Sequence, residues 1–272
     1  MKPQQMHILL TGASGGIGQA TALRLATAGA RIIAVGRTPA PLEALANRLP
    51  PVDSGPHLAI AADLTQSAAR KRMTEQLMTL EQPPNVLINM AGTNQLCLFE
   101  QQDEATIEQL IHLNFTSSVL LTHALIPLLR SRPEARIINV GSTLGSIGYP
   151  GYVSYCSTKF ALRGFSEALG RELADSPIKV QYFAPRATRT SLNAGAADAL
   201  NEELRTPVDS PEAVADALLA FISGSASHRY LGWPEKLFVR LNGLFPSLVS
   251  GSISKQLDTI KNHATKRPEK LS

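Results

Sequence analysis

Short apolar runs alternate with amphipathic segments along most of the chain. The runs are rich in branched apolar residues and show almost no polar alternation, which is typical of strands buried on both faces of a sheet. They read "HILLTG", "RIIAVG", "HLAIAA", "NVLINMAG", "RIINVGS" and "IKVQYFA". Between them, apolar residues recur at helical spacing over 17–28, 41–49, 66–80, 103–130 and 155–174.

This alternation predicts an α/β fold, a doubly wound parallel β-sheet of about seven strands with helices on both faces. Right-handed crossovers then place the ligand crevice at the carboxyl ends of the strands. No internal repeat or low-complexity segment interrupts the alternation.

The last third of the chain has a different pattern. Residues 187–209 are rich in Ala, Thr, Asn and Pro. A helix follows, with Ser210 as its N-cap and Pro211 at its first position. We expect one catalytic domain over 1–233, a helical extension of that domain over 234–264 and a flexible tail over 265–272.

Apolar residues between 237 and 260 form one helical stripe, which we expect to be interrupted near Pro246 and Gly251. Three interpretations stay open. The stripe packs on the domain or at a subunit contact, covers a lipophilic or acyl substrate as a lid, or lies on a membrane surface. Basic residues flank it, namely Lys236, Arg240, Lys255 and Lys261.

Composition excludes several classes of protein. The 272 residues are 44% hydrophobic and 18% charged, and a net charge of +4 comes without a basic stripe carrying interleaved aromatics, so nucleic acid is not the expected partner. The two cysteines and six histidines never fall at metal-ligand spacing, so no metal is expected. Neither a signal peptide nor an apolar run of about 20 residues is seen, and we expect a cytoplasmic protein.

A glycine-rich turn follows the first predicted strand and opens the first helix, in "LLTGASGGIGQA". Gly12, Gly16 and Gly18 allow a tight turn, a close approach of the backbone and close packing of the helix on the strand. The free N–H groups at the start of the helix attract a pyrophosphate. This context predicts a dinucleotide site.

The spacing T-G-x-x-x-G-x-G resembles that of the short-chain dehydrogenase/reductase family, and the resemblance continues over roughly residues 7 to 222. "AADL" resembles the family's adenine-binding turn, with Asp63 on the adenine amino group. "NMAG" resembles its N-N-A-G motif, with Met90 as the departure. The resemblance implies a Rossmann-type fold and cofactor contacts from Thr11, Gly12, Ser14, Gly16, Ile17, Gly18, Asp63, Leu64, Asn89, Ala91 and Gly92, with Asn89 also supporting the sheet.

The end of the second strand, "AVGRT", bears on the choice of cofactor. A carboxylate there grips the ribose hydroxyls of NAD, whereas an arginine pairs with the 2′-phosphate of NADP. The chain has Gly36 and Arg37, and no acid before Glu43. We therefore expect NADP(H), with NAD(H) as the alternative.

The catalytic candidates follow the fifth strand. Tyr155 and Lys159 are one helical turn apart, and Ser142 stands thirteen residues before Tyr155, as in the family's S…Y-x-x-x-K pattern. A neighbouring ammonium and a positive nicotinamide ring would lower the tyrosine pKa and let it transfer a proton. The resemblance implies that Ser142 orients the substrate oxygen and that Asn114 holds a relay water beside Lys159.

The segment after the sixth strand reads "PRATRT", where the family has P-G-x-x-x-T. Pro185 and Thr190 match, and the resemblance implies that Thr188 and Thr190 contact the nicotinamide carboxamide and the pyrophosphate. Arg186 replaces the glycine, and three interpretations stay open: it reshapes the nicotinamide floor, attracts an anionic substrate, or faces solvent. Together with Tyr149 and Tyr152, it is a candidate for lining the substrate site, with packing as the other interpretation of the two tyrosines. The resemblance also implies a substrate loop over 188–209.

The helices over 103–130 and 155–174 match those that relatives use to form dimers and tetramers. A stripe on the second helix, made of Leu162, Phe165, Leu169 and Leu173, supports a homodimer or homotetramer. The sequence thus predicts an NADPH-dependent oxidoreductase acting on a small-molecule carbonyl or secondary alcohol. The alternatives are a non-catalytic NAD(P)-binding regulatory protein and an NAD-dependent alcohol dehydrogenase.

Overall fold

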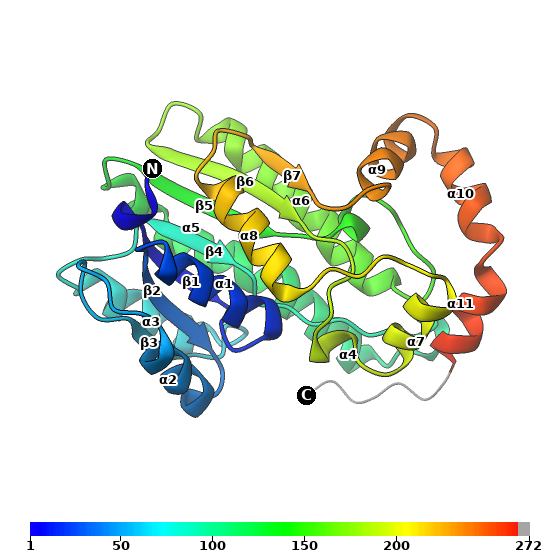
Figure 1. Cartoon of the computed structure of the whole chain (residues 1–272), viewed down its shortest axis with the longest axis horizontal. Coiled ribbons are helices and arrows are strands. Elements are labelled where there is room, and N and C mark those ends of the chain that lie inside the picture. The colour runs from blue at the N-terminus through cyan, green and yellow to red at the C-terminus, as the bar shows by residue number, and fades with distance from the viewer. Residues whose placement is uncertain (266–272) are drawn as a thin grey trace.

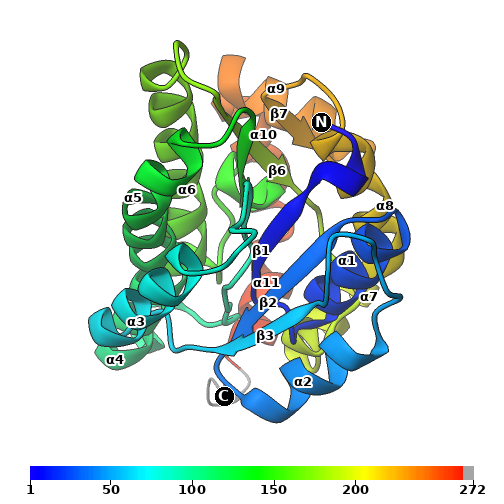
Figure 2. The ribbon, with the colours of Figure 1, turned by 90° about the vertical axis from the view of Figure 1, so that its left-hand side faces the viewer.

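The computed structural model describes residues 1–265 as a three-layer α/β structure, with one central sheet between two layers of helices (Figures 1 and 2). Its seven strands are ordered β3-β2-β1-β4-β5-β6-β7, and neighbouring strands pair in parallel. They are β1 (His7–Thr11), β2 (Arg31–Gly36), β3 (Leu58–Ala61), β4 (Val86–Asn89), β5 (Ala135–Val140), β6 (Ile178–Ala184) and β7 (His228–Tyr230).

The helices divide between the two faces of the sheet, as Figure 2 shows. One face carries α1 (Gly16–Thr27), α2 (Pro39–Arg48) and α8 (Pro211–Ile222), and the other carries α3 (Ser67–Met78), α5 (Ser117–Arg130) and α6 (Val153–Glu172). The remaining helices are α4 (Glu104–Ile111), α7 (Ala196–Glu203), α9 (Glu235–Leu244), α10 (Pro246–Ser254) and α11 (Leu257–Ala264).

Strands β1 to β6 supply side chains to both cores because successive residues of a strand point to opposite faces. In β1, Ile8 and Leu10 belong to the core beneath α1 and α8, whereas Leu9 belongs to the core beneath α3 and α5. In β2, Ile32 and Ile33 divide in the same way. Burial on both sides explains why the sequence shows unbroken apolar runs.

The predicted fold class is confirmed, and the six predicted strands lie within their apolar runs, except that β5 begins one residue earlier, at Ala135. The seventh strand, β7, was not located from the sequence. It is only three residues long, at the edge of the sheet, and His228 is exposed. Pairing with β6 produces this strand, since its own residues carry no apolar run.

The predicted helix over 103–130 is continuous but contains a π turn over His112–Thr116, between α4 and α5. The whole segment, Glu104–Arg130, is long and apolar enough to cross a membrane by length and composition, contrary to the expectation of no such stretch. Its side chains Leu121 and Leu125 are buried in the core beneath α3 and α5, so the apolar face of this helix covers the sheet.

The C-terminal stripe forms three helices, α9, α10 and α11, rather than one interrupted helix. The predicted break at Pro246 is present, but the one at Gly251 is wrong, because Gly251 lies inside α10. Glycine keeps its N–H and lowers helix stability by only about 1 kcal/mol relative to alanine. The second break instead lies at Lys255 and Gln256. Of the predicted tail, residues 266–272 lie outside the described residues.

The leucine stripe of α6 does not face a partner. Leu162, Leu169 and Leu173 are at most 8% exposed, and the last two belong to the core beneath α3 and α5, with Phe165 packed against it. The three leucines therefore cover the protein's own sheet and do not support a subunit contact, and of the stripe only Phe165 is half-buried.

Candidate active site

Three cavities follow one another along the carboxyl edge of the sheet. The first, of about 360 Å³, contains the glycine turn, Arg37 and Leu64. The second, of about 100 Å³, is lined by Ser142, Tyr155 and Lys159 and shares several walls with the first. The third, of about 320 Å³, again contains Ser142 and Tyr155 and extends outward to α9 and α10.

The glycine turn brings two backbone segments close together. Gly12 has a φ of +67°, and a Cβ on it would lie 2.9 Å from the Ala91 backbone. A Cβ on Gly18 would overlap the Gly12 carbonyl oxygen, so α1 starts directly on the turn. Ser14, Gly16, Ile17, Ala91 and Gly92 line the resulting cavity. These are the requirements of a backbone that cradles a pyrophosphate.

Thr11 supports this cradle from behind. Its Oγ1 accepts hydrogen bonds from the amides of Met90 and Ala91 at 2.9 and 3.0 Å, and donates one to the Ile88 carbonyl. The side chain is buried at 1% exposure. Thr11 therefore ties the ends of β1 and β4 together, a role that the sequence analysis had not separated from cofactor contact.

The far end of the first cavity contains Arg37, which follows β2, together with Gly36 and Ser14. Ala62 and Leu64 form a side wall. Between them, Asp63 Oδ1 accepts hydrogen bonds from the amide and the hydroxyl of Thr65 at 2.9 and 2.7 Å. The aspartate thus shapes the turn that carries the wall.

Asn89 belongs to a buried polar ladder that crosses the sheet. Its Nδ2 donates to Thr122 Oγ1 on α5 at 3.0 Å and to Asn139 Oδ1 on β5 at 2.8 Å. Asn139 in turn donates to Ser166 on α6 at 2.8 Å. Buried hydrogen-bond networks of this kind hold their elements in register. Asn89 thus aligns the strand and the helix that carry Ser142 and Tyr155.

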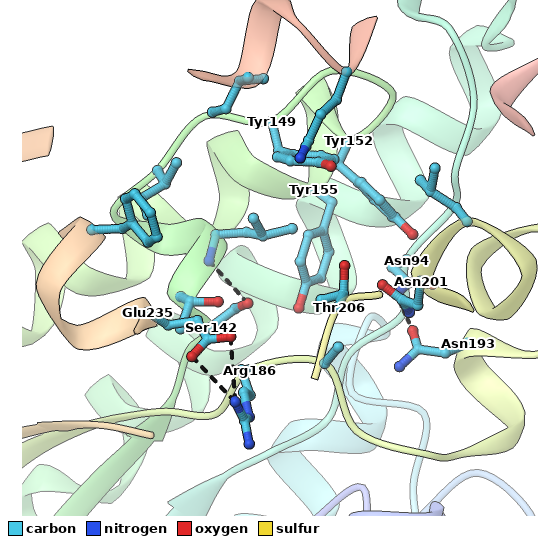
Figure 3. Close-up of a pocket in the computed structure, with 18 of the residues that line it drawn as sticks. Asn94, Ser142, Tyr149, Tyr152, Tyr155, Arg186, Asn193, Asn201, Thr206 and Glu235 are labelled. Atoms are coloured by element: carbon cyan, nitrogen blue, oxygen red, sulfur yellow. Dashed lines mark hydrogen bonds and ion pairs between the residues drawn. The ribbon is translucent and has the colours of Figure 1, made fainter. Parts of the chain in front are cut away.

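Ser142, Tyr155 and Lys159 converge from two elements. Ser142 follows β5, whereas the other two residues lie on one face of α6, and Figure 3 shows the phenol of Tyr155 beside Ser142. The Ser142 side chain lies close enough to the phenol to lower the pKa of Tyr155 by hydrogen bonding, against the larger effect of burial. Lys159 Nζ donates to the Val140 carbonyl at 3.0 Å and lies 5.7 Å from the centre of the Tyr155 ring.

Burial dominates the ionisation of this group. Desolvation raises the pKa of Tyr155 to about 12, partly offset by the hydrogen bond with Ser142. Desolvation also lowers the pKa of Lys159 to about 8. The Tyr155 pKa was expected to be lowered, and without bound nicotinamide this expectation is wrong, because desolvation of the phenolate is the largest effect. Tyr155 keeps its proton through the neutral range.

Asn114 lies in the π turn, with 0% exposure. Its Oδ1 accepts from the Thr93 amide at 2.8 Å, and its Nδ2 donates to the Thr93 carbonyl and to Thr158 Oγ1 at 2.8 and 3.2 Å. The π turn thereby joins the loop after β4 to the residue that precedes Lys159. π turns are frequent at functional sites, but nothing in the sequence indicated this one.

The segment after β6 closes the inner cavity. Pro185, Thr188 and Thr190 all line it, and Thr190 also lines the cofactor cradle. A Cβ on Gly16 would lie 2.9 Å from the Thr190 methyl group, so the segment rests on the glycine turn. Thr188 is 3% exposed and donates to the Arg186 carbonyl at 3.0 Å.

Arg186 is held by two carboxylates. Its Nη2 donates to Asp209 Oδ1 at 2.7 Å. Its Nη1 donates to Glu235 Oε2 at 3.2 Å, and Figure 3 shows this second pair. The three side chains are between 17% and 20% exposed, and the hydrogen bond that Arg186 donates to Asp209 is the main cause of a raised Arg186 pKa. The solvent-facing interpretation is therefore wrong. The sequence analysis missed both carboxylates, which lie in the predicted loop and at the start of the predicted extension.

The outer cavity has a mostly apolar wall. Tyr149 and Tyr152 line it, with the Tyr152 ring centre 6.1 Å from that of Tyr155. The apolar side chains on the remaining wall are Leu144, Ile147, Leu200, Phe238, Val249 and Ile253. Asn94 donates to Asn193 at 2.9 Å where the outer and inner cavities meet, and neither residue was predicted.

This geometry agrees with the comparison to known proteins. The family model for short chain dehydrogenases matches residues 6–201. The chain belongs to the short-chain dehydrogenase/reductase family. It is an oxidoreductase acting on CH–OH or C=O groups, with a site for NAD(P).

The matches to relatives and solved structures cover most of the chain. A 3-oxoacyl-[acyl-carrier-protein] reductase of Aquifex aeolicus is 29% identical over 84% of this chain and 94% of its own. A short-chain dehydrogenase from Sphingobium yanoikuyae in complex with NADPH is 31% identical, with a TM-score of 0.77 over 90% and 95% of the two chains. A bulky-bulky ketone specific alcohol dehydrogenase from Comamonas testosteroni is 29% identical, with a TM-score of 0.74 over 91% and 94%.

Proposed function

We propose that the protein is an NADP(H)-dependent reductase of uncharged, lipophilic ketones or aldehydes, or the dehydrogenase of the corresponding alcohols. One observation carries the proposal: Ser142 and Tyr155 line both the inner and the outer cavity, and the inner one adjoins the glycine cradle. A carbonyl entering from outside would meet both hydroxyl groups before reaching the cradle.

The residues divide the chemistry of reduction between them. Bound NADPH supplies the hydride. Tyr155 holds a proton on its phenolic oxygen at neutral pH and gives it to the carbonyl oxygen, since burial keeps its pKa near 12. Ser142 donates a hydrogen bond to the same oxygen and orients it. The Lys159 ammonium stabilises the phenolate that remains. Asn114 supports the proton relay by fixing the Thr93 loop and Thr158 beside that lysine.

The preference for NADPH rests on Arg37, which lines the cradle where β2 ends. An arginine forms paired hydrogen bonds with a phosphate, and Gly36 supplies no carboxylate to repel one. The structural relative in complex with NADPH supports the same choice.

The substrate class follows from the charges and walls of the outer cavity. Arg186 is paired with Asp209 and Glu235, so it offers no free positive charge to an anionic substrate. The local sum of one cation and two carboxylates disfavours a further anion. The remaining wall combines tyrosine and apolar side chains with neutral polar ones such as Asn94, Asn201 and Gln256, which favours an uncharged substrate with an apolar chain or ring.

A non-catalytic dinucleotide-binding protein is the weaker alternative, because Asn114, Ser142, Tyr155 and Lys159 are all present and three of them meet at one cavity. Cytoplasmic location and a homo-oligomer stay predictions.

The direct experiment incubates the protein with NADPH and a panel of neutral aryl and long-chain ketones and aldehydes, and the corresponding alcohols with NADP. Turnover of lipophilic members and none of keto acids is expected, whereas no turnover of any member would overturn the proposal.

A further inference from the structure

Large apolar side chains gather at the corner between α9 and α10. Leu244, Phe245 and Leu248 are 72%, 55% and 65% exposed. They are adjacent along the chain, and the corner lies at one extremity of the molecule, away from the sheet (Figure 1). Exposed apolar side chains are common singly, but a contiguous group marks a surface that contacts something apolar. We call these three residues the apolar corner.

The same two helices also form part of the substrate cavity. Phe238 on α9 and Val249 and Ile253 on α10 line the outer cavity, with Val249 only 5% exposed. Glu235 fixes the start of α9 to Arg186. The helices thus have one side on the cavity that contains Ser142 and Tyr155, and an apolar corner in solvent.

The charges around the corner are positive. Lys236 and Arg240 are exposed on α9, and Lys255 is exposed directly after α10. Glu235 is the only acidic residue between 233 and 256, and it lies at the start of α9, paired with Arg186, at the opposite end of the helix from the apolar corner. Basic residues beside an exposed apolar group are typical of helices that lie in the interface of an anionic membrane.

A second copy of the chain fits this surface less well. A two-fold contact through the corner would place the same patch on both sides of the interface. Both sides of the contact would then carry Lys236, Arg240 and Lys255, and the one carboxylate in 233–256, Glu235, is already paired with Arg186. An anionic lipid surface satisfies both the apolar and the charged part of the patch.

We propose that the corner between α9 and α10 docks on an anionic lipid surface. Leu244, Phe245 and Leu248 insert among the acyl chains, while Lys236 and Arg240 contact the phosphate groups. Docking would place the helices of the outer cavity at the membrane, so a lipophilic substrate dissolved in the bilayer has a short path to Tyr155. Only this last step rests on the proposed function.

The test uses the full chain and sedimentation with vesicles of phosphatidylcholine, alone or mixed with phosphatidylglycerol. Wild type is expected to bind the mixed vesicles, and to lose affinity as salt rises from about 0.1 M to 0.5 M. The variant L244S/F245S/L248S is expected to bind at least about tenfold more weakly. The variant K236Q/R240Q is expected to lose the preference for phosphatidylglycerol.

The matched control is L23S/M78S, which removes two exposed apolar side chains on α1 and α3 and is expected to bind like wild type. Circular dichroism establishes that each variant is folded. Absence of wild-type binding to mixed vesicles, or equal binding by the triple variant, would overturn the proposal. So would a wild-type dimer that the triple variant converts to a monomer without any binding to vesicles. Binding without turnover of any ketone would leave docking intact and overturn the proposed function instead.

Discussion

Arg186 Nη2 lies 2.7 Å from Asp209 Oδ1, and this ion pair joins the segment after β6 to the end of the substrate loop. The backbone reinforces the junction, since the Asp209 amide donates to the Ala187 carbonyl at 2.9 Å. With Glu235 as its second partner, Arg186 also holds the start of α9. Arg186, which replaces the family's glycine, thus acts as a clamp: it holds the end of the substrate loop and the start of α9 together at the outer cavity.

Replacing this clamp residue by the family's glycine is predicted to loosen the cavity. In Arg186→Gly, Asp209 and Glu235 become unpaired carboxylates at about 20% exposure, and we expect the free energy of unfolding to fall by about 2 kcal/mol. KM for a ketone should rise more than kcat falls. Urea unfolding and steady-state kinetics measure both. R186G/D209N/E235Q should regain most of the stability, and an equal loss in both variants would contradict the clamp.

Tyr182 is predicted to position the catalytic serine from behind. Its hydroxyl donates to the Ser142 carbonyl at 3.2 Å and accepts from the Ser142 amide at 3.4 Å. Tyr182→Phe leaves that buried amide without its partner, so stability should fall by about 1 kcal/mol. We expect kcat to fall by about tenfold, with little change in the KM for NADPH. Unchanged kcat together with lowered stability would make Tyr182 merely structural.

The sequence predicted the elements and the reacting groups because both depend on local patterns. Apolar runs specify buried strands. The three reacting side chains were predicted from their spacing, since Ser142 follows a strand and Tyr155 and Lys159 are one helical turn apart. Asp209 and Glu235 escaped prediction because their meeting with Arg186 depends on tertiary packing over 23 and 49 positions. The burial that sets the Tyr155 pKa is likewise a property of the folded protein.

The lowered pKa of Lys159 is predicted to appear in the pH profile. Reduction needs the charged ammonium beside Tyr155, so kcat/KM for the ketone should fall as pH rises through about 8. Tyr155 adds no alkaline limb in this range, since its pKa is near 12. A profile that is flat up to pH 10 would contradict this assignment.

The free energy of unfolding should also depend on the ionisation of Lys159, and the burial of its ammonium determines whether stability rises or falls with pH. The folded pKa of Lys159 lies near 8 and the unfolded one near 10.5, so burying the ammonium costs free energy at neutral pH. As pH rises from 8 to 10.5, that cost of about 3 kcal/mol is relieved, because the unfolded chain releases its proton later. The stability of wild type relative to Lys159→Met should therefore increase over this interval. Urea unfolding of both proteins at a series of pH values measures it.

Cofactor selection is predicted to depend on Arg37. Arg37→Ala removes the guanidinium from the end of the cradle, so affinity for NADPH should fall by about tenfold to a hundredfold, while affinity for NADH changes little. Fluorescence titration of both cofactors gives the ratio. An unchanged ratio would assign the preference to another part of the cradle.

The most direct test of the proposed chemistry is single-turnover reduction of a ketone by NADPH-loaded Tyr155→Phe. The substitution removes one oxygen from a residue that lines both cavities, and we predict a loss of about a thousandfold in the hydride-transfer rate with NADPH affinity kept. Tyr152→Phe is the matched control, because its ring lies 6.1 Å from that of Tyr155, and it should lose less than about tenfold. Hydride transfer by Tyr155→Phe at a rate near that of wild type would contradict the assignment of Tyr155 as the proton donor.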